Sequence, residues 1–183
     1  AFKDDLLVAF ASGTDPSTTS CAGVMPDSAK YTHVALIQKD SLVSITPHAV
    51  ALVTDLRLAA RSDGAWLVTS GPSSEVRISR VDPQGQVVGS PLVWPALALP
   101  GSLAVTSFDD FLVVGWIESD SAGSSPHVQV FGPDGAALAG LKLDGSTTAQ
   151  GRLSLISSPF AHSAVLAWSE TQPNPQNSDQ LPV

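Results

Sequence analysis

The chain has few residues of several types that often indicate a function. Cysteine, methionine and tyrosine occur once each among 183 residues, and charged residues make up 14%. Because Cys21 is alone, no disulfide can form within the chain. It lies in a loop-like stretch, where it is either an unpaired thiol or the partner of a cysteine in another chain. Because charged residues are few, the polar surface must come largely from serine, threonine, glutamine and the backbone, as in many extracellular β proteins.

Positive charge is also scarce, and none of it is clustered. Nine lysines and arginines stand against seventeen acidic residues, which gives a net charge of −8. Nucleic-acid binding and docking to an anionic membrane both need a basic cluster, so the sequence predicts neither.

Long apolar runs are missing as well. A membrane-spanning helix needs roughly 18 apolar residues, and the longest approach to that, Leu92–Leu99, is interrupted by Pro95. We therefore expect no membrane insertion. The first residue is Ala1 and not methionine, which favours a processed product whose targeting segment has been removed.

What the chain does contain is a repeat. Phe10, Trp116 and Trp168 each follow a small residue at the end of an apolar run, and Ser70 takes that position in a fourth phrase. These positions are 60, 46 and 52 residues apart. A period of about 50 without a helical pattern predicts a radial array of small β-sheets. The four phrases are Leu6–Ser12, Ala65–Gly71, Leu112–Glu118 and Ala164–Glu170.

The second and third units align strand by strand. Third strands at 77–81 and 127–131 run into the turns Asp82–Gly85 and Gly132–Gly135. Proline at the second turn position fixes φ and the glycine accepts positive φ, so both turns are predicted to be tight. The remaining strands alternate apolar and polar residues, as half-buried strands do. They are expected at 56–60, 65–71 and 86–94 in one unit, and at 103–107, 112–118 and 136–143 in the other.

The first and last units are incomplete. The first has no strand ahead of Leu6–Ser12 and carries a long insertion at Gly13–Lys30, whereas the last offers two strands before a Pro-rich tail at 171–183. We expect an all-β fold, a partial β-propeller of about four antiparallel blades, of which two are complete and two incomplete. A closed ring needs roughly sixteen strands, and about thirteen are predicted. The blades are expected near 1–54, 55–101, 102–150 and 151–170.

The incomplete units should leave unpaired sheet edges. Proteins rarely expose such edges, because their free N–H and C=O groups invite pairing with other strands. We therefore expect another protein chain to pair with the edge at Leu6–Ser12 or at Ser163–Glu170.

The turn phrases resemble those of a known family. Val81-Asp-Pro-Gln-Gly-Gln-Val-Val-Gly and Phe131-Gly-Pro-Asp-Gly-Ala-Ala-Leu-Ala are similar to repeats of secreted bacterial β-propeller proteins. The resemblance covers roughly residues 5–170 and rests on turn and packing motifs. It implies a propeller fold and an extracellular or cell-envelope location, in the periplasm or at the cell surface. Members of this family are mostly binding or scaffold modules, and a fold alone does not fix a function.

Motifs for catalysis or cofactor binding are missing from the sequence. Gly71-Pro-Ser-Ser-Glu75 lacks the second glycine of a hydrolase nucleophile elbow. The chain has no phosphate-binding glycine loop, no zinc-binding histidine pair and no EF-hand loop. We therefore assign no catalytic, cofactor-binding or metal-binding residues, and expect neither a cofactor nor enzymatic activity.

The four histidines are weak candidates for a metal site. His33 and His127 share one repeat position, with Arg77 at the equivalent place between them. Imidazoles along one rim could bind a metal, but we expect solvent-facing residues at the start of the third strands. His48 and His162 fall at unrelated loop positions.

Acidic pairs and tryptophans are the other candidates. The pairs Asp4-Asp5 and Asp109-Asp110 could bind a cation or support glycoside hydrolysis, but aspartate is also a common turn residue, which is the expected role. Trp116 and Trp168 could stack on sugars, but their aliphatic neighbours predict burial between sheets.

Two functional hypotheses follow. The leading one is a non-enzymatic structural or protein-interaction module, completed by another chain or by missing sequence. The alternative is a carbohydrate-binding or glycan-processing propeller with part of its site in the loops.

Overall fold

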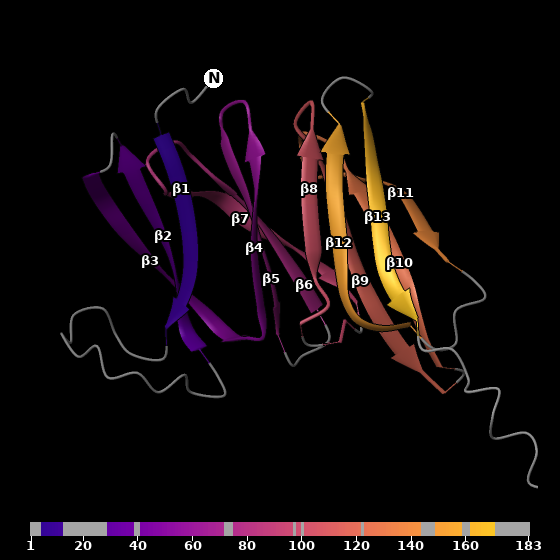
Figure 1. Ribbon diagram of the computed structural model, residues 1–183. Coiled ribbons are helices and arrows are strands. Elements are labelled where there is room, and N and C mark those ends of the chain that lie inside the picture. Colours follow the sequence, from indigo (N-terminus) through magenta and orange to yellow (C-terminus); the bar gives the residue numbers. More distant parts are fainter. Residues whose placement is uncertain are drawn as a thin grey trace, which may run out of the picture.

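The fold is all-β and antiparallel, as predicted. The computed structural model describes residues 5–12, 29–38, 41–71, 75–96, 98–99, 101–121, 123–143, 149–158 and 162–170. These residues form thirteen strands in four separate sheets and contain no helix (Figure 1). Within them, accordingly, no helix is long and apolar enough to span a membrane. Cys21, Asp4 and the tail 171–183 lie outside the described residues.

The four sheets follow the order of the chain. Sheet 1 has three strands, sheets 2 and 3 have four each, and sheet 4 has two. Within each sheet, neighbouring strands are also neighbours in sequence. Sheet 1 is β1 (Asp5–Ser12), β2 (Ala29–Gln38) and β3 (Ser41–Val53), and sheet 4 is β12 (Ala149–Ser158) and β13 (Ser163–Glu170). Sheet 2 is β4 (Asp55–Arg61), β5 (Gly64–Gly71), β6 (Glu75–Val81) and β7 (Val87–Pro95). Sheet 3 is β8 (Ala104–Phe108), β9 (Phe111–Asp120), β10 (Gly123–Phe131) and β11 (Ala137–Lys142).

The two Pro-Gly turns form as predicted. Gly85 N–H donates to Asp82 C=O at 3.0 Å, and Gly135 N–H donates to Gly132 C=O at 2.9 Å. Both glycines have positive φ, 82° and 88°, which other residues rarely adopt. These turns therefore fix the register of β6 with β7 and of β10 with β11.

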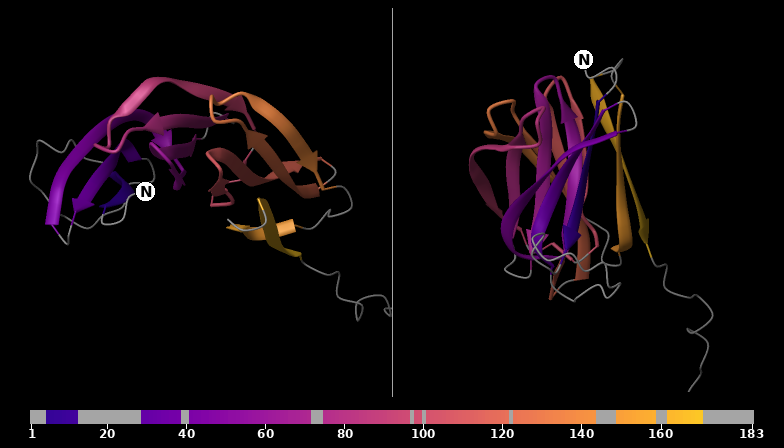
Figure 2. Two further views of the ribbon diagram at one scale, coloured as in Figure 1. Left: turned by 90° about the horizontal axis from the view of Figure 1, so that it is seen from above. Right: turned by 90° about the vertical axis from the view of Figure 1, so that its left-hand side faces the viewer.

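The first strands of successive sheets lie side by side. β1 contacts β4, β4 contacts β8, and β8 contacts β12. Seen from above, the sheets follow one another along an arc (Figure 2). Sheets 2 and 3 therefore pack one face against the sheet before and the other against the sheet after, whereas sheets 1 and 4 each have one neighbouring sheet.

The largest core cluster lies between sheets 2 and 3. Trp66 and Ile78 of sheet 2 meet Leu112 and Trp116 of sheet 3, and all four side chains are buried. Phe131 of β10 packs edge-to-face on Trp94 of β7, with ring centroids 5.5 Å apart. Every strand of sheet 2 contributes to this cluster, as do β8, β9 and β10 of sheet 3.

Three details of the sequence prediction are wrong. Ala29 and Lys30, placed in an insertion, begin β2, and His48, placed in a loop, lies in β3 opposite Thr32. A third detail concerns the repeat position assigned to Ser70. Thr69, not Ser70, lies opposite Arg77 in the way that Trp116 lies opposite His127. The connections between strands differ in length, so a single sequence offset does not locate this position.

Candidate functional site

The open side of sheet 4 is the least complete part of the described fold. β13 pairs with β12 along one edge, and sheet 4 contains no third strand among the described residues. One face of this sheet packs on sheet 3, where Leu155 and Leu166 join a cluster with Ile117. Ile156 and Val165 point from the opposite face and are 68% and 65% exposed. Among the described residues, β13 is therefore an edge strand, and sheet 4 exposes an apolar face.

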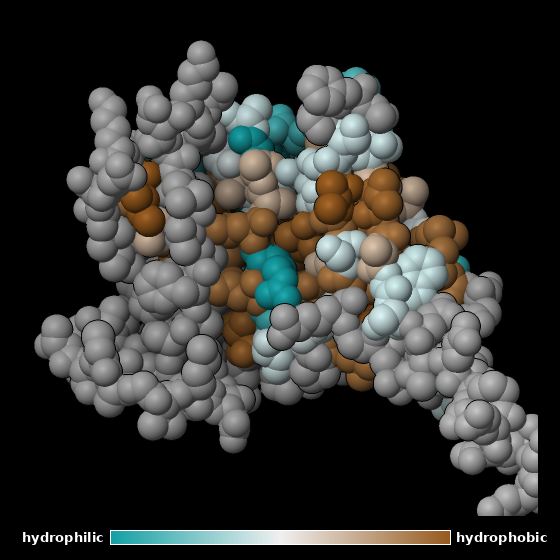
Figure 3. All heavy atoms as spheres, in the orientation of Figure 1, coloured by the Kyte–Doolittle hydropathy of each residue, from teal (hydrophilic) through white to brown (hydrophobic). Residues whose placement is uncertain are grey.

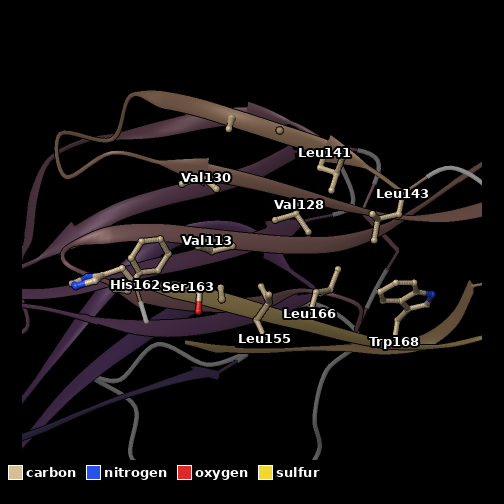
Figure 4. Close-up of a pocket in the computed structure, with 14 residues that line it drawn as sticks. Val113, Val128, Val130, Leu141, Leu143, Leu155, His162, Ser163, Leu166 and Trp168 are labelled. Carbon is tan, nitrogen blue, oxygen red and sulfur yellow. The ribbon is translucent and has the colours of Figure 1, made fainter. Parts of the chain in front are cut away.

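A cavity of about 530 Å³ opens between sheets 3 and 4 beside β13. Its walls are mostly aliphatic side chains from the facing surfaces of β10, β11, β12 and β13 (Figure 4). Leu141 of β11 borders it and is 59% exposed. Apolar atoms also gather over the region of β8, β12 and β13 on this side of the molecule (Figure 3). The cavity is suited to apolar side chains more than to a charged or strongly polar ligand.

Trp168 lies at one end of this cavity, and its predicted burial is wrong. Its residue exposure is 38%, whereas that of Trp116 is 5%, as predicted. Both face the preceding sheet, but Trp116 is also covered by the ring of His127, stacked with centroids 5.5 Å apart. His127 belongs to β10, the third strand of its sheet, and the described part of sheet 4 has no equivalent strand. Trp168 is therefore exposed where a third strand would otherwise cover it.

At the other end of the cavity, turns from different sheets are joined. His162, in the turn between β12 and β13, contacts the carboxylate of Asp109 in the turn between β8 and β9. The neighbouring Asp110 accepts hydrogen bonds at 2.6 Å from the N–H and from the hydroxyl of Ser62, in the turn between β4 and β5. Both aspartates have positive φ, 47° and 66°. Asp109-Asp110 thus forms a turn that links sheets 2, 3 and 4.

Hydrogen bonds, ion pairs and burial shift the pKa values of three aspartates in sheets 2 and 3. The Ser62 hydroxyl and N–H groups hold the pKa of Asp110 below its usual value, because they stabilise the carboxylate form. In the turn between β4 and β5, the Arg61 guanidinium likewise holds the pKa of Asp63 below its usual value. By contrast, burial raises the pKa of Asp55, although Gly101 N–H and Arg57 both favour its ionised form.

The repeat position of His127 and Arg77 has local partners in each sheet. His127 lies 3.8 Å from Glu118, whose carboxylate also accepts the indole N–H of Trp116 at 3.2 Å. Arg77 pairs with Glu75 at 2.5 Å. The side chain of His33 lies outside the described part of the structure. Each described residue therefore interacts within its own sheet, and the described residues contain no group of three or more metal-binding side chains.

Comparison with known proteins adds no assignment. No family model matches the chain, and no curated protein matches its sequence. The site must therefore be interpreted from its own geometry.

Sequence reasoning predicted the two strands of sheet 4 but missed the cavity. It predicted two strands in the last unit, and the structure contains β12 and β13 there. The available signal was Trp168, a large apolar residue in a unit without the third strand that covers its counterpart. Such a residue predicts an uncovered apolar surface next to the open edge.

Proposed function

We propose that this chain is a non-enzymatic protein-interaction module, a partial β-propeller whose incomplete sheets are completed by strands from another polypeptide. The propeller part of the proposal is supported by the adjacent first strands β1, β4, β8 and β12 and by the arc of sheets (Figure 2). Propeller blades are likewise four-stranded antiparallel sheets arranged around a centre. The complete sheets 2 and 3 match that pattern.

The observation that carries the proposal is the contrast between equivalent residues in sheets 3 and 4. Val113 of β9 borders the interface between sheets 3 and 4 and is 3% exposed, whereas its counterpart Val165 of β13 is 65% exposed. Trp116 and Trp168 show the same contrast on the opposite face. Apolar side chains that are buried in sheet 3 but exposed in sheet 4 are typical of an interaction site.

Binding of an extended strand is the mode that suits this site. An edge strand offers main-chain N–H and C=O groups, and alternate side chains of the added strand enter adjacent pockets. β13 supplies the edge and the cavity supplies the pocket. A carbohydrate would use Trp168 for stacking, but it also needs several hydrogen-bonding groups, and the cavity walls are mostly aliphatic. A protein strand is therefore the better occupant.

The proposed location is extracellular or in the cell envelope. This part of the proposal depends on the resemblance of the turn phrases Val81–Gly89 and Phe131–Ala139 to secreted propeller repeats. A low content of charged residues, 14%, is compatible with it.

Hydrogen exchange tests whether β13 is an accepting edge. The chain is recovered from its own cells with its partners attached and is compared with the isolated chain. We expect the amides of β13 to exchange at least tenfold more slowly in the assembly, because added backbone hydrogen bonds protect them. The amides of β5 and β9, which are paired on both sides, serve as the control and should not change. Equal exchange of β13 in the two samples would contradict the proposal.

A further inference from the structure

We propose that the occupant of the cavity is a β-hairpin of the same pattern as β10–β11, carrying a large apolar residue that inserts beside Ala164. This inference rests on the proposed function and specifies the chemistry of the partner. The first strand of the hairpin pairs with β13, and its second strand covers the edge that the first would otherwise leave open. The argument comes from the two complete sheets of the same chain.

In both complete sheets, the third strand ends on a buried apolar residue just before the Pro-Gly turn. Val81 of β6 lies opposite Ala65 and is 2% exposed. Phe131 of β10 lies opposite Leu112 and is 1% exposed. Each of these residues faces the preceding sheet, as its core cluster shows. A third strand thus places an apolar side chain between its own sheet and the one before.

The position that such a residue would oppose in sheet 4 is Ala164. Leu112 precedes Trp116 by four residues on β9, and Ala164 precedes Trp168 by four residues on β13. Ala164 and Trp168 both border the cavity (Figure 4). A residue paired with Ala164 would therefore enter the cavity, and a residue paired with Trp168 would cover the indole as His127 covers that of Trp116.

Side chains on the opposite wall of the cavity are also more exposed than their equivalents between sheets 2 and 3. Ile78 of β6 and Val128 of β10 are equivalent by register, since they pair with Leu92 and Leu141 respectively. Ile78 is 2% exposed in the filled interface between sheets 2 and 3. Val128 is half-buried and Leu141 is 59% exposed in the interface between sheets 3 and 4. The cavity between sheets 3 and 4 thus corresponds to a position that is filled between sheets 2 and 3.

Size and sequence narrow the choice of occupant. Pockets that take drug-sized organic groups measure about 300–1,000 Å³, and at about 530 Å³ this cavity has room for an aromatic side chain. The chain's own segment 171–183 contains Pro173, Pro175 and Pro182. Proline cannot donate to a ladder of backbone hydrogen bonds, so this segment is a poor third strand.

The chain supplies its own probe, a synthetic peptide of residues 123–143 that contains β10 and β11. Binding is measured by anisotropy of the labelled peptide and by hydrogen exchange of β13 in the full chain. We expect saturable binding that protects β13 amides. A peptide with Phe131→Ala should bind at least tenfold more weakly, because it leaves the cavity unfilled.

Two variants of the full chain test where the peptide binds. Ala164→Trp fills the cavity and should weaken binding at least tenfold. Ala167→Trp, on the opposite and exposed face of β13, is the matched control and should change binding less than twofold. Binding that responds to neither Phe131→Ala nor Ala164→Trp would overturn the inference. The Phe131→Ala comparison does not depend on the folding of a cavity variant.

A tethered form removes the dependence on peptide solubility. Residues 123–143 are appended after Val183, so that residues 171–183 act as the linker. If neither the free nor the tethered hairpin protects β13, while the native assembly does, the hairpin inference is wrong and the interaction module stands. If the native assembly does not protect β13 either, both fail. Protection of β13 in a dimer of the unmodified chain would assign the site to a second copy and would also overturn the hairpin.

Discussion

Asp109 and Asp110 illustrate how two adjacent carboxylates can serve structure and not chemistry. One accepts from Ser62 of sheet 2 and the other contacts His162 of sheet 4, so a single turn connects three sheets. Aspartate tolerates the left-handed backbone conformation that both residues adopt. The sequence predicted a turn here, because aspartate commonly bonds to neighbouring backbone groups. It did not predict that these bonds would cross between sheets.

The bond between Ser62 and Asp110 makes stability depend on pH. The folded-state pKa of Asp110 is lowered, so its contribution is present above the unfolded pKa of about 3.9 and is lost as pH falls through the folded pKa. At pH 7, Asp110→Ala should lower the free energy of unfolding by about 1–2 kcal/mol. Urea unfolding at several pH values should show this difference shrinking below about pH 4. A difference that is constant down to pH 2 would contradict the assignment.

The two equivalent tryptophans should differ sharply in their contribution to stability. Trp116 is 5% exposed and packs in the core between sheets 2 and 3, so Trp116→Ala should cost about 3–5 kcal/mol. Trp168 borders a cavity and is 38% exposed, so Trp168→Ala should cost only about 1 kcal/mol. Chemical unfolding of both variants measures the contrast. Equal losses would show that Trp168 is covered in solution.

At the scale of elements, one glycine sets how closely sheet 4 approaches sheet 3. A Cβ atom on Gly115 of β9 would lie 3.2 Å from Cδ1 of Leu155 and 3.4 Å from Cδ1 of Leu153, both on β12. The side chains of β12 thus pack directly over the backbone of β9. A larger residue at this position must displace these leucines, and a branched one such as valine must displace them further.

Gly115→Val should therefore loosen sheet 4 selectively. Overpacking of this kind costs about 1–3 kcal/mol. We expect faster hydrogen exchange in β12 and β13, with β5 and β6 unchanged. Gly115→Ala should have a smaller effect in the same strands, because its one added methyl group displaces the leucines by only a few tenths of an ångström. Uniform acceleration in all four sheets would contradict this local role.

Strands and turns were the predictable part of the fold. Alternating apolar residues and the Pro-Gly turns determine β4 to β11 locally, and the structure contains these strands close to the expected positions. Contacts between sheets were less predictable. The described residues include no third strand of sheet 4 that would cover Trp168, and the cavity depends on how sheets 3 and 4 pack, which local sequence patterns do not determine. His48 was placed in a loop, but it lies in β3 next to Pro47, and proline is tolerated there because β3 is an edge strand of its sheet.

At the scale of the whole molecule, the uncovered apolar face of sheet 4 should govern self-association. The net charge of −8 opposes aggregation, whereas exposed Ile156 and Val165 favour it. We expect the average mass of the isolated chain to rise with concentration in light scattering. The double variant Ile156→Lys and Val165→Lys should reduce this rise, because it places charge on the face that associates.

Val93→Lys provides the matched control for that experiment. Val93 of β7 is 47% exposed, but it belongs to a complete sheet. The substitution should leave self-association within about twofold of the unmodified chain, because isolated exposed valines are common on protein surfaces. If Val93→Lys suppresses association as strongly as the double variant, overall charge and not the face of sheet 4 controls it.

The stacking of sheets along the chain has a consequence for finding the partner. When each sheet is stabilised mainly by contacts with its neighbours, the sheet with the fewest such contacts unfolds first. The local free energy of unfolding then varies along the chain. A ligand that binds only the folded form adds RT ln(1 + [L]/Kd) to the part that it holds. The partner should therefore raise the melting temperature of sheet 4 before that of sheets 2 and 3. A thermal-shift screen of the unmodified chain, in which the lowest-temperature transition is assigned to the end with sheet 4, would then act as a detector for that partner.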